Sequence, residues 1–110
     1  MNKIEKAILY EATGGAELRL CLRTDTRVDT GRWWRKSRLW LCITEDQLIV
    51  LAAARRQYVQ SVPMSQCSGT HYCHAAGELV IDPVEELEFD HIAMSPVDAL
   101  CVLEAMGITV

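Results

Sequence analysis

A short stretch in the second half of the chain brings together residue types that bind zinc. Cys67, His71, Cys73 and His74 follow the spacing Cys-x3-His-x-Cys-His. Thiolate and imidazole groups are common zinc ligands, and a thiol beside a histidine can also act as a nucleophile. In an extended strand His71 and Cys73 point to one face and His74 to the other, so the ligands converge only if the strand bends. The spacing matches no common zinc pattern, which favours exposed histidines beside a buried thiol over a zinc or thiol site.

A second group combines positive charge with aromatic rings between residues 32 and 38. Guanidinium groups match the geometry of phosphate, and basic clusters near a membrane attract anionic lipid headgroups. Binding of an anionic lipid or a phosphorylated ligand is therefore one use of this segment. The other interpretation, which the sequence favours, is structural: the arginines stack on a tryptophan at the rim of the fold through cation–π contacts. The candidate ligand-binding residues are Arg32, Trp33, Trp34, Arg35, Lys36 and Arg38.

The sequence contains no recognisable catalytic signature, and it predicts a non-enzymatic protein without a cofactor. Nothing in the sequence near Cys73 supplies the third group that would orient a histidine toward a thiol nucleophile. Acidic residues alternate with apolar ones along an expected strand that ends near residue 92. This alternation predicts a solvated face and not a calcium loop. The acidic residues concerned are Asp82, Glu85, Glu86, Glu88 and Asp90.

The composition predicts a single folded domain, residues 1–110, in the cytoplasm. Half of the residues are hydrophobic and 24% are charged, which is typical of a globular protein. The formal net charge of -4 argues against a nucleic-acid binder, whose field attracts phosphate. No apolar run has the length of a membrane span, and the charged N-terminal segment does not resemble a secretory signal. The five scattered cysteines suit reduced thiols better than a disulfide framework.

The elements that position these groups are expected to be organised around a hairpin at residues 38–54. Its two strands flank the polar turn 44–47 and are apolar at almost every position, so both faces of the hairpin should be covered. Three further strands are predicted at 57–62, 70–74 and 78–82, with proline, glycine and alanine at their ends.

Two other segments alternate between apolar and polar residues. Residues 16–23 predict a strand whose leucines, including Leu18, point inward, followed by a polar loop at 24–31. Residues 85–92 predict a strand with Leu87 and His91 inward and carboxylates outward.

Both ends of the chain are predicted to be helical. A short helix at residues 1–13 should stop at a pair of glycines. The helix at residues 95–106 has clearer signals, because Ser95 can cap it, Pro96 can occupy its first position and a glycine follows it. It is apolar on nearly every side, so it is either deeply seated or shared with a partner.

The order of short strands followed by one helix resembles the pleckstrin-homology-like domain superfamily, specifically its bacterial relatives. The segment GRWWRKSRLWLCITEDQLIV at residues 31–50 carries the resemblance, and residues 95–106 look like the family's C-terminal capping helix. Lys36-Ser37-Arg38 is similar to the basic-x-Arg element of members that bind phosphoinositides, whereas the family's upstream lysine is missing. The resemblance implies a mainly β fold, a barrel or sandwich of about seven antiparallel strands capped by the C-terminal helix.

The preferred functional prediction is a non-enzymatic module that binds a protein partner or copies of itself. The acidic face at 82–90 and the basic segment 32–38 can meet head-to-tail between copies, and the apolar helix supports self-association as well. One alternative is a peripheral binder of anionic lipid or a phosphorylated ligand through residues 32–38. A third is a small zinc or thiol site at residues 67–74.

Overall fold

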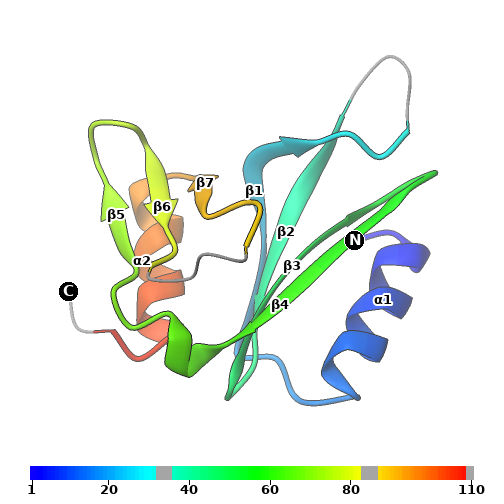
Figure 1. The fold of residues 1–110 in the computed structure, drawn as a ribbon, viewed down its shortest axis with the longest axis horizontal. Helices are drawn as coiled ribbons and strands as arrows, with labels where there is room; N and C mark the ends of the chain where they lie inside the picture. Colours follow the sequence, from blue (N-terminus) through cyan, green and yellow to red (C-terminus); the bar gives the residue numbers. More distant parts are fainter. Residues whose placement is uncertain (32–35, 83–86, 109–110) are drawn as a thin grey trace.

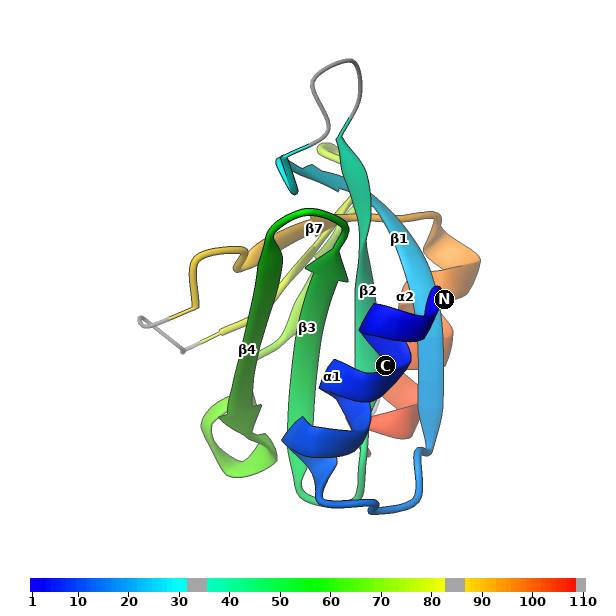
Figure 2. The same ribbon diagram turned by 90° about the vertical axis from the view of Figure 1, so that its right-hand side faces the viewer.

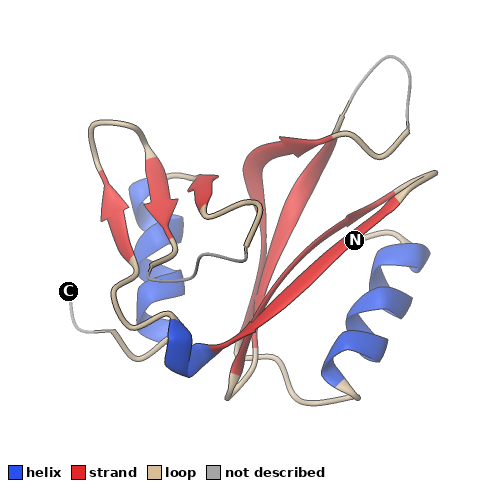
Figure 3. Cartoon of the chain, in the orientation of Figure 1, coloured by secondary structure: helices blue, strands red, loops and turns tan. Residues whose placement is uncertain are grey.

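The structure, a computed structural model, describes residues 1–31, 36–82 and 87–108 of the chain. Its described part is mainly β, with two antiparallel sheets and a helix toward each end, as the sequence predicts (Figures 1 and 3). The elements in chain order are α1 (Lys3–Thr13), β1 (Leu20–Val28), β2 (Ser37–Ile43), β3 (Gln47–Ala53), β4 (Gln57–Pro63), the short 3-10 helix η1 (Met64–Gln66), β5 (His71–Cys73), β6 (Glu78–Val80), β7 (His91–Ala93) and α2 (Pro96–Ala105).

The central sheet is an antiparallel meander in which β1, β2, β3 and β4 lie in chain order. The hairpin predicted at residues 38–54 is confirmed as β2 and β3, which pair with Ile43 opposite Leu48. The Thr44 amide donates to the Gln47 carbonyl at 3.0 Å, and the Gln47 amide donates to the Thr44 hydroxyl at 3.1 Å. The polar turn thus satisfies its own backbone groups and helps to fix the register of the hairpin.

Both faces of the central sheet are covered, by layers of different size. Successive residues of β2 point to opposite faces, so that Leu39 and Leu41 enter the main core while Trp40 and Cys42 face α1. In Figure 2, α1 lies across one face of the sheet, and α2 and the second sheet lie behind the other. The core on the α1 side consists of Leu9, Cys42, Ile49 and Leu51, with Met1, Ala12, Cys21 and Trp40 partly buried against it.

The main core lies between the central sheet and a layer formed by the second sheet and α2. The second sheet is also an antiparallel meander, in the order β5, β6, β7. It contributes Leu79 and Ile92, and α2 contributes Val102, all of them fully buried. Within the described ranges no strand pairing joins the two sheets, so they do not close into a barrel, which is one of the two arrangements that the sequence predicts.

Strand β1 differs from the strand predicted at residues 16–23. It begins at Leu20 and continues to Val28, through residues predicted to form a polar loop. Leu18 is exposed and not inward, whereas Leu20 and Leu22 do pack against the main core. The apolar alternation ends at Leu22, but pairing with β2 holds the polar residues that follow in the sheet.

The last strand also differs from its prediction. β7 covers only His91–Ala93, with Ile92 buried and His91 exposed, so the expected inward orientation of His91 is wrong. Ile92 lies opposite Leu79 on β6, and the burial of this apolar pair explains the orientation of the strand. Leu87 is buried as predicted, from a loop that precedes β7. The first two residues of the predicted strand lie outside the described part of the chain.

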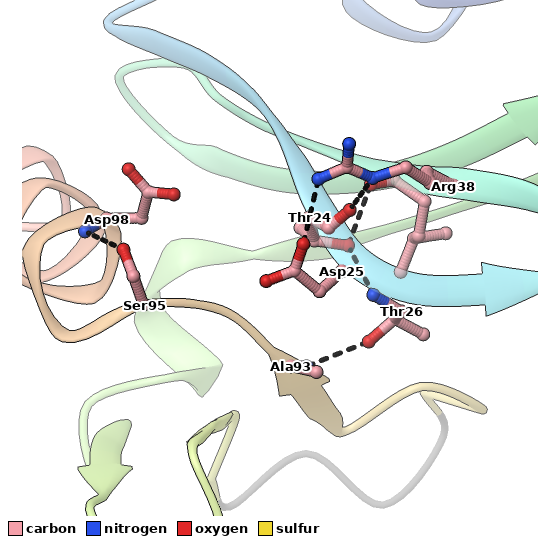
Figure 4. Close-up of polar contacts among 8 residues, drawn as sticks. Thr24, Asp25, Thr26, Arg38, Ala93, Ser95 and Asp98 are labelled. Carbon is pink, nitrogen blue, oxygen red and sulfur yellow. Dashed lines mark hydrogen bonds and ion pairs between the residues drawn. The ribbon is translucent and has the colours of Figure 1, made fainter.

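Both predicted helices are confirmed, and each has a side-chain N-cap. In α1 the Asn2 side chain accepts from the Glu5 amide at 2.8 Å, and the Glu5 carboxylate accepts from the Asn2 amide at 3.0 Å. Gly14, with φ 63°, ends this helix in a conformation that favours glycine. In α2 the Ser95 hydroxyl accepts from the Asp98 amide at 3.2 Å (Figure 4).

Candidate anion-binding site

The candidate site begins with an irregularity in β1. Arg23 lies opposite Trp40, and Arg27 lies opposite Arg38, so the register of the β1–β2 pair shifts between the two arginines of β1. Residues 24–26 form a bulge, which bends a strand and re-aims the side chains beside it. With the register shifted, Arg27 lies opposite Arg38, and both β1 arginines line the same cleft as Arg38 and Trp40.

Arg38 holds the bulge in place (Figure 4). Its Nε donates to the Thr24 carbonyl and its Nη2 to the Asp25 carboxylate, both at 2.8 Å. On the other side of the bulge the Thr26 hydroxyl accepts from the Ala93 amide at 2.8 Å, which ties β1 to β7. The bulge is therefore fixed both within the central sheet and to the second sheet.

A cleft of about 370 Å³ lies between this end of the central sheet and the start of α1. Four basic residues line it: Arg23, Arg27, Lys36 and Arg38. Guanidinium and ammonium groups that converge on one cleft are suited to bind phosphate or carboxylate. The other residues that line the cleft are Met1, Asn2, Glu5, Ser37, Trp40 and Ala53.

Three of the four cations have no carboxylate partner among the described residues. Arg38 pairs with Asp25, whereas Arg23, Arg27 and Lys36 are exposed and make no ion pair within that part of the chain. Arg27 also lies directly opposite Arg38, and like charges that face each other across a strand pair destabilise a sheet. An anion bound between them would remove this repulsion.

Glu5 is the carboxylate that lines the cleft, and its oxygens are already engaged. Oε2 accepts from the backbone amide of Ala53 at 3.2 Å, and Oε1 accepts from the backbone amide of Asn2 at 3.0 Å. The Asn2 side chain in turn donates to the Ala53 carbonyl at 2.9 Å. These bonds fasten the start of α1 to the end of β3, so that the helix forms a fixed wall beside the basic residues.

The structure places only part of the predicted ligand-binding segment. Lys36 and Arg38 line the cleft together with two residues outside the predicted segment, Arg23 and Arg27. The sequence predicts a loop at Arg27, and only the pairing of β1 with residues 37–40 brings this residue beside Arg38. The remaining candidates, Arg32, Trp33, Trp34 and Arg35, lie outside the described residues.

The predicted zinc or thiol residues do not converge. In the described ranges no group of three or more histidine, cysteine, aspartate or glutamate side chains is placed to hold a metal ion. Nδ1 of His71 lies 3.0 Å from the Gly69 carbonyl oxygen, and the His74 ring meets the Tyr72 ring edge-on with centroids 4.9 Å apart. Burial raises the pKa of the Cys67 thiol, which disfavours the thiolate that a metal or an electrophile needs. Cys73, between the two histidines, is half-buried.

Helix α2 presents an apolar strip on its outer side. Val97 is 71% exposed and Leu100 is 45% exposed, and Cys101 is exposed next to them. Residues at these spacings lie on one side of a helix. The opposite side buries Val102 and Leu103 in the main core. The helix is thus seated on one side and open on the other.

No protein-family model, curated protein or solved structure matches the chain. Among the helices of the described ranges, none is long and apolar enough to cross a membrane. A functional assignment therefore depends on the chemistry of the cleft and on the exposed side of α2.

Proposed function

We propose that the protein is a non-enzymatic domain that binds an anionic ligand bearing phosphate groups. The observation that carries this proposal is the convergence of Arg23, Arg27, Lys36 and Arg38 on one cleft. Three of these cations have no carboxylate partner in the described part of the chain, so their charge is available to a ligand. Planar guanidinium groups bind phosphate oxygens through paired hydrogen bonds, which favours phosphate over a simple halide.

The local basic cluster contrasts with the acidic net charge of the whole chain. With a formal net charge of -4, the protein as a whole does not attract anions over long distances. Salt screens charges beyond about 10 Å, so within the cleft the nearby cations dominate the potential. Such an arrangement favours a compact phosphate ligand over an extended nucleic-acid backbone.

Titration with tripolyphosphate tests the proposal. Trp40 lines the cleft, so its fluorescence should change as the cleft fills, and calorimetry should give a saturable isotherm that weakens with added salt. Co-sedimentation with phosphatidylcholine vesicles, with and without phosphatidylserine, distinguishes a lipid surface from a soluble phosphate compound. If the protein binds tripolyphosphate but neither kind of vesicle, the ligand is a soluble phosphate compound. If it also binds the vesicles that contain phosphatidylserine, and not those without it, the ligand is a lipid headgroup.

Matched charge variants show whether binding occurs in the cleft. Arg23→Gln and Arg27→Gln should each weaken tripolyphosphate binding about tenfold or more, because a hydrogen bond to a charged group contributes about 1.5–3 kcal/mol. Arg19→Gln is the control, since Arg19 precedes β1 at its other end and changes the net charge equally. Equal losses in all three variants, or no saturable binding by the unmodified protein, would contradict the proposal.

Self-association through α2 is a second candidate function, favoured by the exposure of Val97 and Leu100. In a two-fold dimer the same strip of both copies meets, and Cys101 of each copy then lies close to the axis. Light scattering should show a dimer that Leu100→Asp converts to a monomer, and Cys101 should cross-link the dimer. A monomer at every concentration rejects this candidate.

The pleckstrin-homology-like resemblance belongs to the same proposal. The order of the strands and the position of α2 after them support that family, and residues 36–38 carry its basic-x-Arg element. Arg27 of β1 adds a basic residue upstream of that element, on the same cleft. A crystal structure with tripolyphosphate bound would test the family and the ligand position together.

A further inference from the structure

Two cysteines face each other across the β1–β2 pair, on the side of the sheet that α1 covers. Cys21 lies opposite Cys42, and their Sγ atoms are 2.8 Å apart. Residues directly opposite in an antiparallel pair have Cα atoms about 4.5–5.5 Å apart. A disulfide bridges Cα atoms about 4.4–6.8 Å apart, so the strand pairing provides the separation that such a bond requires.

We propose that Cys21 and Cys42 form a reversible dithiol–disulfide site. Both are free thiols in this structure. The other cysteines lie apart from this pair, next to η1, in β5 and in α2, and no sulfur–sulfur contact joins them in the described part of the chain. The five cysteines therefore contain one pair arranged for an intramolecular bond.

The two thiols of the pair have unequal environments, which assigns them different parts in the exchange. Cys42 is fully buried, whereas Cys21 is half-buried and within reach of a reagent from solvent. The hydrogen bond between the two thiols lowers the pKa of Cys21, and the same hydrogen bond together with burial raises the pKa of Cys42. Cys21 is thus the thiol that ionises first, and Cys42 is the thiol that completes the bond.

The oxidant is a low-molecular-weight disulfide such as oxidised glutathione. The Cys21 thiolate attacks one sulfur of that disulfide, forms a mixed disulfide and expels the other half as a thiolate. The Cys42 thiol then loses its proton, and its sulfur attacks Cys21 Sγ, which forms the Cys21–Cys42 bond and expels the second half. Two protein thiols are oxidised, the external disulfide is reduced to two thiols, and the two cysteine protons end on those thiols.

The Cys21–Cys42 disulfide would close a covalent loop of the chain that contains the basic residues of the cleft. All four of its cations lie between positions 21 and 42, and Arg23 follows Cys21 on the same face of β1. Oxidation thus restrains β1 against β2 directly beside the cleft. The dithiol site does not depend on the proposed ligand, because its oxidation can be measured with no ligand present.

Equilibration in glutathione buffers of increasing oxidised fraction tests the site. After acid quenching and unfolding, free thiols are alkylated and the linked peptides are identified by mass spectrometry. The experiment uses the Cys101→Ser variant, because an exposed thiol can form bonds between molecules. We expect one disulfide that joins the peptides containing Cys21 and Cys42, with the other two cysteines alkylated, and complete reversal by dithiothreitol.

Three further variants in the same background identify the pair. Cys21→Ala should remain fully alkylated in every buffer, and Cys42→Ala should form no bond between its own cysteines and should retain Cys21 as the mixed disulfide with glutathione, whereas Cys73→Ala should form the disulfide as before. Circular dichroism shows whether each variant is folded. If a variant does not fold, the peptide map of the parent protein still decides whether Cys21 and Cys42 form the bond. The proposal is overturned if no Cys21–Cys42 peptide appears in any buffer, or if a different pair oxidises first.

Discussion

The two faces of the central sheet carry layers that differ in size and in chemistry. On one face the second sheet and α2 bury a continuous apolar core, in which Leu41 and Val50 are fully inaccessible. On the other face α1 covers a smaller core around Leu9, and the same face carries the basic cleft and the Cys21–Cys42 pair. The alternation of one strand, β2, supplies both faces. Neighbouring residues of β2 can therefore change the main core and the cleft almost independently.

Truncation of one leucine on each face is expected to give the largest effect and the sharpest comparison. Leu41→Ala should lower the free energy of unfolding by about 2–5 kcal/mol, because the large core cannot collapse around the cavity. Leu9→Ala should cost less, since Leu9 is 8% exposed and lies in the smaller core. Urea denaturation of both variants measures the difference. Equal losses would show that α1 contributes as much to stability as the second layer does.

Oxidation of Cys21 and Cys42, on the face that carries the cleft, should stabilise the folded protein. A disulfide that closes a loop of this length contributes about 3 kcal/mol by restricting the unfolded chain. Urea denaturation of the protein oxidised by glutathione, with and without dithiothreitol and in the Cys101→Ser background, measures the gain. Cys42→Ala should show no difference between the two conditions. A similar gain in that variant would assign the effect to another pair of cysteines.

The N-caps of the two helices allow a matched test of the two faces. Asn2→Ala and Ser95→Ala should each lower the free energy of unfolding by about 1 kcal/mol through loss of a cap. Only Asn2→Ala should also weaken tripolyphosphate binding, because Asn2 lines the cleft and bonds to Ala53. Calorimetric titration of both variants makes the comparison. A comparable loss of binding in Ser95→Ala would mean that the two faces are coupled.

The smallest expected effect concerns His91 on the second sheet. Its hydrogen bond to Asp90, at 2.9 Å, raises the pKa of His91 above 6.5. Since the folded pKa exceeds the unfolded one, the contribution to stability is complete below about pH 6.5 and is lost as the pH rises through the raised value. NMR titration should show a lower His91 pKa in Asp90→Asn. An unchanged value would assign the shift to other charges.

The sequence predicts those parts of the fold that local signals determine. The turn at residues 44–47, the caps of α2 and the apolar β2 and β3 strands each carry their signal within a few residues, and the structure confirms them. The burial of both faces of the hairpin follows from its apolar residues alone. The coarse fold class follows from the order of such elements.

The candidate site depends on information that no local pattern contains. Thr24, Asp25 and Thr26 indicate a loop by composition, but pairing with β2 and the contacts of Arg38 turn them into a bulge within a strand. The position of Arg27 opposite Arg38 follows only from the shifted register. The predicted orientation of His91 is wrong for a similar reason, because the pairing of β7 with β6 decides which residues of the strand are buried, and the alternation of apolar residues does not.

The strand order described for both sheets also bears on the order of folding. Each strand pairs with its neighbour in the chain, and contacts that are close in sequence form fast. The bond from the Ala93 amide to the Thr26 hydroxyl joins positions 67 residues apart and closes a far longer loop. We therefore expect the two meanders to form before they dock. The Cys21–Cys42 pair should then assemble early, while the main core is still incomplete and both thiols are open to a reagent in solution.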